Sequence, residues 1–588
     1  MLPVLLFLSA VLGAGESLLR DAAFAQGLEQ WRAEAGRARI EVVTLDNTPC
    51  VSIHGDTVDG YPRLVQDFDA APGALYSASV LARADGITGG YGAYMTIEFS
   101  GADGKRIHFE QSSPASGSGA WTPLLTLSVA PPGAAKGMIC LVLRGAGTAL
   151  FRAPQVELTE SPPSAELPSE VRLEFGAPLP GTFRGFGVED DGWLANKDNA
   201  AKGVTEADIA RVQERAAWMN PALVRMFFWY PDFNPSGDWT SFDFDSDNMR
   251  SHYRALDNWQ KIGANVNLTG VEWGMKSPWA QPEAMARAIG ALFSELITKR
   301  EYTCIKRWTL TNEPNTHFEQ EGGSFARYRE LHQLVAKEFA ARGLNIEIVG
   351  SDDTNGGLPW FTQCVGDPEY FGLAGSMASH FYLKKDSLRA AKYNVIDRLD
   401  LLAGRKPFTI EEFGFQDSRS TAVENPLMQE FDYALLASAF AIDAVARGVS
   451  GVTLWCLHEM HYPGTYMNYG LFHYKDKDWA PKPVFFAWSS LTRHARPGDS
   501  VQMPAAPLHP ALAVVKIGAN LFVVNQSAQP VRFVLEGVPL HGAAVFDEGC
   551  LPAADADEAT LRAAAEGRPL AVSEAGFTVP ARSFGRAW

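Results

Sequence analysis

Two short runs in this sequence each place a glutamate where an apolar, β-prone segment ends. The first run is Trp308–Asn315, with the sequence WTLTNEPN, and the second is Phe408–Gly414, with the sequence FTIEEFG. Glu313 and Glu412 lie 99 residues apart (412 − 313), with strand and helix patterns between them. Two carboxylates at the carboxyl ends of two barrel strands supply what glycoside hydrolysis needs, one acid/base and one nucleophile.

Strand and helix patterns alternate between residues 170 and 497. Strands are expected at Phe183–Gly187, Leu223–Phe228, Val266–Val271, Ile305–Thr311, Ile346–Gly350, Ala378–Tyr382, Phe408–Glu412 and Val452–Trp455. Amphipathic helices are expected at Glu206–Met219, Glu283–Thr298, Phe325–Ala341 and Met428–Arg447. This repetition predicts a (β/α)8 TIM barrel over residues 170–497. A doubly wound open sheet is the alternative, and it is weakened because no strand opens into a Gly-rich phosphate-binding loop.

The segments on either side of the barrel have β-rich patterns. Residues 17–160 contain short alternating runs separated by Gly and Pro clusters, which predicts a β-sandwich. The run from Gln66 to Tyr76, with Trp121 further on, resembles the jelly-roll modules that bind carbohydrate; a packing domain without a ligand is the alternative. The Pro-rich residues 161–169 predict a linker, and residues 498–588 predict a small C-terminal β-domain.

The barrel segment resembles the clan A glycoside hydrolases, the group that contains cellulases, mannanases and β-xylosidases. The resemblance covers residues 170–497 and rests on Asn-Glu-Pro after the fourth expected strand and Glu-Phe-Gly at the seventh. It implies that Glu313 is the general acid/base and Glu412 the nucleophile of a retaining mechanism. It also implies a set of substrate-binding or supporting side chains, namely Arg225, Asn312, His380, Tyr382 and Trp455.

Physical chemistry agrees with these implied roles. The acid must hold a proton near neutral pH, so we expect a raised pKa for Glu313. The nucleophile must stay ionised, and Arg225 is the cation expected beside it. Asn312 is implied to contact the sugar 2-hydroxyl, where contacts strengthen in the transition state. Trp455, at the end of the eighth expected strand, suits the apolar face of a sugar ring.

The chain departs from the clan pattern at Glu411, where the residue before the nucleophile is commonly Ser or Thr. This leaves open which of Glu411 and Glu412 is catalytic. Adjacent strand residues point to opposite faces, so only one of them is expected to face the reacting centre. Glu412 is the better candidate because Phe413-Gly414 follows it as in the clan pattern.

Other residues near expected strand ends could meet a sugar. Trp193, Trp229, Trp273 and Trp360 are candidate sugar platforms, although barrels also pack tryptophan for structural reasons. The acidic run Glu189–Asp191 follows the first expected strand. A solvated loop is the expected structure for this run, and contact with hydroxyls or with a cationic sugar is the alternative.

Composition limits the partners and the compartment. The net charge of −17 argues against nucleic acid and against an anionic membrane surface, and no apolar run after the leader is long enough for a transmembrane helix. Residues 1–15 resemble a signal peptide, which predicts a secreted or periplasmic protein; a buried N-terminal strand is the alternative. The six cysteines lack CxxC spacing, so neither a metal site nor a cofactor is expected.

The sequence therefore predicts a secreted, retaining β-glycoside hydrolase acting on a polysaccharide or oligosaccharide in the manner of an endo-glucanase or mannanase. An exo-acting β-glycosidase, such as a β-xylosidase-like enzyme, is the alternative within enzymes. A non-catalytic carbohydrate-binding or adhesion protein is the alternative from another class. The oligomeric state is left open.

Overall fold

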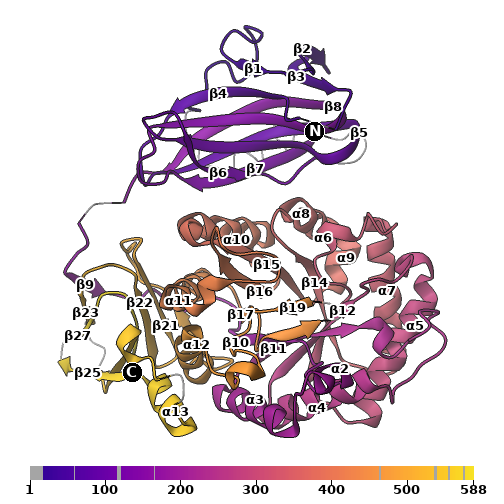
Figure 1. Cartoon of the computed structure of the whole chain (residues 1–588), viewed down its shortest axis with the longest axis vertical. Helices are drawn as coiled ribbons and strands as arrows, with labels where there is room; N and C mark the ends of the chain where they lie inside the picture. Colours follow the sequence, from indigo (N-terminus) through magenta and orange to yellow (C-terminus); the bar gives the residue numbers. More distant parts are fainter. Residues whose placement is uncertain are drawn as a thin grey trace. The chain divides into compact units, whose positions relative to one another are not determined.

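The computed structural model describes residues 17–588, except for 59, 116–118, 120, 164–165, 463–464, 536–539, 554–555 and 574–575. The expected leader, residues 1–15, lies outside the described residues. The chain forms two compact units that divide near residue 165 (Figure 1). Among the described residues, no helix combines the length and the hydrophobicity that crossing a membrane requires.

The N-terminal unit is an antiparallel β-domain. Its strands are β1 Arg32–Glu34, β2 Arg39–Leu45, β3 Thr48–Gly55, β4 Arg63–Asp69, β5 Leu75–Ser100, β6 Arg106–Gln111, β7 Thr122–Val129 and β8 Lys136–Glu160. The long strands β5 and β8 pair with each other, and between them they also pair with β3, β4, β6 and β7. Alternate residues point inward, so Leu141, Ile97 and Phe151 join one buried apolar core. The expected β-rich character of residues 17–160 is confirmed.

The second unit contains a closed barrel of eight parallel strands. The strands are β10 Gly185–Asp190, β11 Leu223–Trp229, β12 Asn265–Val271, β13 Ile305–Thr309, β14 Glu347–Asp353, β15 Ser376–Lys384, β16 Phe408–Gln416 and β17 Gly451–Leu454. Each lies where the sequence predicted a strand, with ends shifted by a few residues. The expected (β/α)8 barrel is therefore confirmed.

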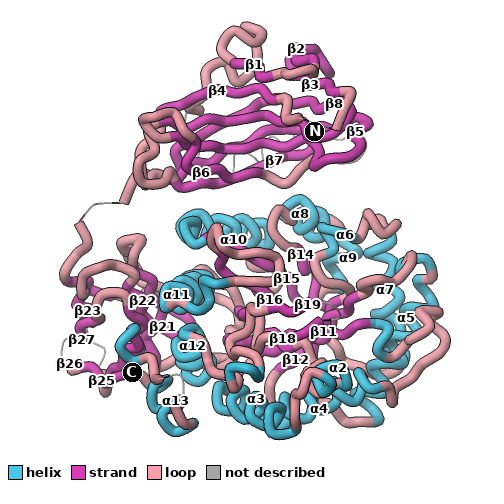
Figure 2. Tube along the Cα trace, viewed as in Figure 1, coloured by secondary structure: helices cyan, strands magenta, loops and turns pink. Residues whose placement is uncertain are grey.

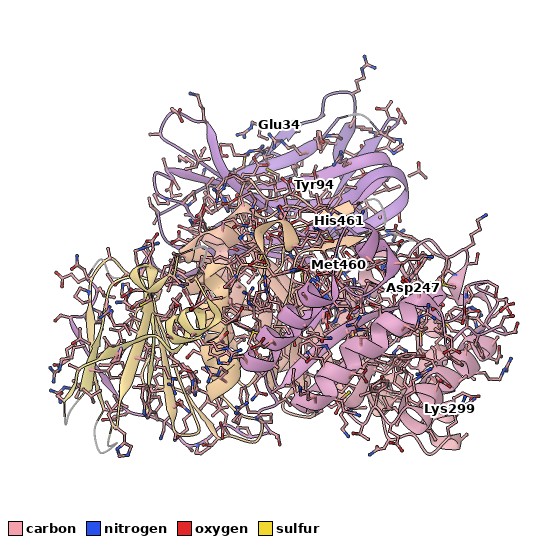
Figure 3. The ribbon with its side chains drawn as sticks, turned by 60° about the horizontal axis from the view of Figure 1, so that its bottom comes forward. Glu34, Tyr94, Asp247, Lys299, Met460 and His461 are labelled. Atoms are coloured by element: carbon pink, nitrogen blue, oxygen red, sulfur yellow. The ribbon has the colours of Figure 1, made fainter. Side chains whose placement is uncertain are left out.

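Helices surround the barrel strands (Figure 2). They are α2 Lys197–Ala201, α3 Glu206–Met219, α4 Asp247–Ile262, α5 Pro282–Phe293, α6 Pro314–His317, α7 Phe325–Ala341, α8 Leu358–Gly366, α9 Pro368–Leu373, α10 Leu388–Leu402, α11 Phe431–Ala446 and α12 Pro483–His494. Helix α3 begins at a capping box in which Thr205 and Asp208 satisfy each other's backbone N–H groups. Helix α5 continues into the wider turn η3, Ser294–Lys299, whose last residue lies at the outer edge of the barrel in Figure 3.

The C-terminal β-domain takes its first strand from a distant part of the sequence. Residues Glu170–Leu173, which the sequence assigned to the start of the barrel, instead form β9 and pair in parallel with β23, Val531–Leu535. Val171 and Leu173 alternate inward into the core of this domain, and that burial explains the pairing. Figure 1 shows the purple strand β9 beside the yellow strands β23 and β27.

The other strands of this domain are β20 Val501–Gln502, β21 Leu512–Ile517, β22 Asn520–Asn525, β24 Ala543–Asp547, β25 Arg568–Leu570, β26 Val572–Ser573, β27 Gly576–Val579 and β28 Ser583–Ala587. One helix that the sequence did not predict, α13 at Glu558–Glu566, lies among them. The Glu558 carboxylate pairs with Arg215 of α3 at 2.6 Å, which ties this domain to the barrel.

Candidate active site

The residues singled out from the sequence meet at the carboxyl ends of the barrel strands. Glu313 follows β13, and Pro314 begins the short helix α6 directly after it. Glu313 has φ of 49°, a left-handed conformation that a non-glycine residue adopts only at an energetic cost. Glu412 lies on β16, and His380 lies opposite it in register on β15.

Arg225 of β11 is the buried cation that connects these strand ends. Its side chain is 0% exposed. One amino group, Nη1, donates to Glu412 Oε2 at 3.0 Å. The other, Nη2, donates to Asn312 Oδ1 at 2.7 Å and to Asp352 Oδ2 at 2.9 Å. Arg225 therefore holds the expected nucleophile, the amide before the expected acid, and a third residue on β14.

Asp352 is a site residue that the sequence did not reveal. It is fully buried on β14 and also accepts from His380 Nε2 at 3.0 Å. Ser351 and Asp352 both have positive φ, 67° and 55°, and the register of β14 shifts at this point. This irregular backbone brings Asp352 to Arg225, and no pattern of residue types in the strand indicates it.

His380 lies between the two expected catalytic carboxylates. Its Nδ1 is 3.1 Å from Glu313 Oε1 and 3.3 Å from Glu412 Oε2. Burial alone would lower its pKa, but the charges of Asp352 and Glu412 raise the pKa of His380 to about 10. His380 is therefore an imidazolium, so both of its ring nitrogens donate.

The two carboxyl groups expected to be catalytic are close together. One oxygen of Glu313, one oxygen of Glu412 and one ring nitrogen of His380 all lie within 4.8 Å of one another. Tyr382 Oη donates to Glu412 Oε1. The Trp455 ring lies 6.0 Å from the Tyr382 ring, in an edge-on arrangement. The structure thus brings every site residue expected from the sequence into one network or into contact with it.

The proton distribution in the resting site differs from the expectation. Burial raises the pKa of Glu412, and the charge of Glu313 raises it further. The charges of His380 and Arg225 act in the opposite direction, but the pKa of Glu412 is raised overall. Burial also acts on Glu313, but the hydrogen bond and charge of His380 outweigh it and lower the pKa of Glu313. The expected raised pKa of Glu313 is therefore wrong for the resting site, because the His380 imidazolium stabilises its charged form.

Glu411 lies inside the barrel and not on the opposite face from Glu412. The register between β15 and β16 pairs Ser379 with Ile410 and His380 with Glu412, so Glu411 is the extra residue of a β-bulge. Arg307 Nη1 of β13 donates to Glu411 Oε1 at 2.5 Å. Because β13 is not a neighbour of β16, this contact must cross the barrel interior. The expectation of opposite faces is wrong, since the bulge interrupts the alternation.

The four tryptophans fall into two groups. Trp193 and Trp273 pack against Tyr462 with ring centroids 6.0 and 6.1 Å away, and Trp229 Nε1 donates to the Trp273 carbonyl. Trp273 is 42% exposed, so its ring is available to a sugar. Trp360 is buried and packs edge-on against Tyr328 and near other rings between helices, so its role is structural.

The acidic run Glu189–Asp191 is buried, and the expectation of a solvated loop is wrong. Glu189 is 0%, Asp190 6% and Asp191 2% exposed. These residues end β10, and Glu189 lies beside Arg225 in register.

Two groups of described side chains have the spacing of metal ligands. They are Glu313 with His380 and Glu412, and Glu272 with His317 and Glu321. In the second group His317 Nε2 is 2.6 Å from Glu272 Oε1. Burial alone would lower the pKa of His317, but the hydrogen bond and charge of Glu272 raise it overall. In both groups the histidine forms an ion-pair contact with a glutamate of the same group.

Neither a family model nor a curated protein matches this chain. Solved structures do match. The catalytic domain of GH30 xylanase C from Talaromyces cellulolyticus has a TM-score of 0.53 at 12% identity, covering 71% of this chain and 98% of that one. A GH39 β-xylosidase from Caulobacter crescentus has a TM-score of 0.50 at 14% identity, covering 71% and 98%. The resemblance to clan A glycoside hydrolases is thereby confirmed for the fold.

The ion pair between Glu411 and Arg307 predicts how a substitution at Glu411 changes the stability of the protein. Glu411→Gln leaves Arg307 buried without a counter-charge and should lower the free energy of unfolding by about 3–5 kcal/mol. Burial alone would raise the pKa of Glu411, but the charge of Arg307 outweighs burial and lowers the pKa of Glu411 in the folded protein. The stabilisation is therefore present above the ordinary glutamate pKa of about 4.3 and is lost as pH falls through the lower folded value. Denaturant unfolding at several pH values should show the two proteins converging in acid. A difference that does not depend on pH would contradict the ion pair.

Proposed function

We propose that this chain is a retaining β-glycoside hydrolase. The observation that carries the proposal is the approach of Glu313 and Glu412 within 4.8 Å, beside a buried arginine and an imidazolium. Retaining enzymes hold their two carboxyl groups about 5–5.5 Å apart, whereas inverting enzymes need about 6.5–9.5 Å to admit a water. The close approach of one oxygen from each carboxyl group supports the retaining arrangement.

The first step of the proposed reaction is glycosylation of the enzyme. A Glu412 oxygen attacks the anomeric carbon while Glu313 gives its proton to the departing glycosidic oxygen. Arg225, His380 and the Tyr382 hydroxyl each contact Glu412 and favour its charged form. His380 lowers the pKa of Glu313 in the resting site. Bound substrate must therefore weaken the contact between His380 and Glu313, so that Glu313 takes up the proton that it later donates.

The second step releases the sugar. Glu313, now ionised, takes a proton from a water that attacks the anomeric carbon and breaks its bond to Glu412. Asn312 Oδ1 is occupied by Arg225, so the Asn312 amide hydrogens are left to donate to a sugar 2-hydroxyl. The Trp455 ring meets those of Tyr382 and Tyr469, which supports its proposed role as the apolar floor for the sugar in the cleaved subsite.

The proposed substrate is a polysaccharide or oligosaccharide. The exposed Trp273 ring favours an extended sugar chain over a monosaccharide glycoside. Because neighbouring folds are named a xylanase and a β-xylosidase, xylan and xylosides belong in the substrate panel beside glucans and mannans. The leader also supports the proposal that the protein is secreted or periplasmic.

A retaining mechanism predicts the stereochemistry of the product. The product first formed from an aryl β-glycoside should keep the β-configuration, because two displacements at one carbon restore it. A proton NMR time course, recorded before mutarotation, distinguishes the anomers. First-formed α-product would overturn the double-displacement mechanism.

Substitutions at Glu412 and Glu411 identify the nucleophile. Glu412→Ala should lower kcat by several orders of magnitude, since it removes the covalent step. Azide fits the space left by the carboxylate and should restore part of the rate on an activated aryl glycoside. Glu411→Gln is the matched control, and it should keep the covalent step without azide. The reverse pattern, with Glu411→Gln rescued by azide and Glu412→Ala active, would assign the nucleophile to Glu411.

The N-terminal β-domain supports a further proposal, that it binds polysaccharide. Tyr61 is 56% exposed with the Arg144 guanidinium 5.1 Å above its ring, and Tyr91 and Tyr94 pack together nearby. Aromatic rings beside polar groups are suited to sugar faces.

Tyr61→Ala, or removal of residues 17–160, should therefore reduce hydrolysis of insoluble polysaccharide and spare soluble aryl glycosides. Pull-down of the protein on insoluble substrate, with the soluble assay as control, measures both effects. Equal loss on both substrates would indicate that this domain has a structural role.

A further inference from the structure

The buried acids Glu189 and Asp191 are not used in the reaction described above. Neither oxygen of Glu189 has a hydrogen-bond partner among the described residues when Glu189 is an ionised carboxylate, and neither does Asp191 Oδ1. Asp191 Oδ2 accepts from the hydroxyl of Tyr462, on β18 Met460–Tyr462, whose first residue is labelled in Figure 3. A buried charge without a donor is strongly disfavoured.

Arg225 does not supply the missing donor. It lies beside Glu189 in register, but no hydrogen bond joins the two: its amino groups donate to Glu412, Asn312 and Asp352, and its Nε has no partner among the described residues. Asp190, the residue between the two acids, is satisfied separately: Trp259 Nε1 donates to it at 2.7 Å and His458 lies 3.7 Å away. Glu189, once it carries a proton, can donate to Asp191.

We propose that Glu189 and Asp191 share one proton and that this keeps a second negative charge away from the nucleophile Glu412. The proton resides on Glu189 and is donated to the Asp191 carboxylate. Glu189 is thus a positioning residue that acts through Asp191 and sets the ionisation of Glu412. The inference rests on the proposed function for its catalytic consequence, but the shared proton itself does not.

Electrostatics support the arrangement. Burial raises the pKa of Glu189 well above its ordinary value, and the charges of Asp191 and Glu412 raise it further. Burial also raises the pKa of Asp191 to about 6, against hydrogen bonds from Tyr462 and Glu189 that lower it. The titratable groups that face the pair are Arg225, Glu412, Asp190, Cys456, His458 and Tyr462.

The charge balance of the site shows what the proton achieves. Arg225 and His380 are cations, and three carboxyl groups contact them, those of Asp352, Glu412 and Glu313. An ionised Glu189 would add an uncompensated negative charge close to Glu412. Because nearby like charges raise the pKa of a carboxyl group, Glu412 would be protonated over more of the working pH range.

Infrared spectroscopy of the full chain tests the shared proton without any substrate. The native protein at neutral pH should show the carbonyl stretch of a buried carboxylic acid, and Glu189→Gln should remove one such component. Asp190→Asn, at the adjacent position, is the matched control and should keep the component, because His458 and Trp259 lower the pKa of Asp190 despite its burial. Circular dichroism establishes that each variant is folded. An unchanged carboxylic acid band in Glu189→Gln would overturn the proposal.

The pH profile of kcat/KM on a 4-nitrophenyl β-glycoside tests the effect on Glu412. Asp191→Asn removes the charge that holds the proton on Glu189, so Glu189 should ionise more readily. The acid limb, which reports the nucleophile, should then move to higher pH by about one unit. The double variant Glu189→Gln with Asp191→Asn should move it back, since glutamine cannot ionise.

A purely structural role would damage the double variant at least as much as the single one and would not restore the limb. If Asp191→Asn and the double variant share one profile, the proposed coupling to Glu412 is wrong. If the native protein hydrolyses no glycoside at all, the proposed function fails while the infrared result still decides whether the proton is shared.

Discussion

The candidate active site depends on one buried cation, Arg225. A guanidinium with no exposure to water needs anions and acceptors around it, and it finds them on β14, on β16 and after β13. These segments are distant in sequence, and the barrel makes them neighbours in space. Once Arg225 is fixed, Glu412, Asp352 and Asn312 have little freedom, and His380 is held in turn by Asp352. Glu313 then has the imidazolium as its near partner.

The regular barrel supplies the frame, and local irregularities aim the side chains. Glu313 and Asp352 both adopt left-handed backbone conformations at the ends of their strands. The bulge at Glu411 lets two successive glutamates face the barrel interior, one toward Arg307 and one toward Arg225. Such backbone costs persist only where surrounding contacts compensate for them, and here buried ion pairs do so. The irregular backbone thus coincides with residues of the candidate site.

The same division explains what could be predicted from the sequence. Apolar β-prone runs end where the barrel strands end, so Glu313, Glu412, Arg225 and Tyr382 could be located from pattern and resemblance. The bulge could not be located, because alternation assumes a regular strand. Asp352 was missed for a related reason, since its role depends on a shifted register.

Burial and long-range pairing were the other limits of the sequence. The run Glu189–Asp191 has the composition of a solvated loop, yet the barrel closes over it, and β9 pairs with a strand that lies more than three hundred residues later. The buried acids also bear on catalysis. Two cations, Arg225 and His380, face three carboxyl groups, those of Asp352, Glu412 and Glu313, so they leave no charge to balance Glu189. Glu313 and Glu189 must then each carry a proton when the nucleophile is charged. In the proposed mechanism Glu313 gives its proton to the substrate, whereas Glu189 keeps its proton in the contact with Asp191.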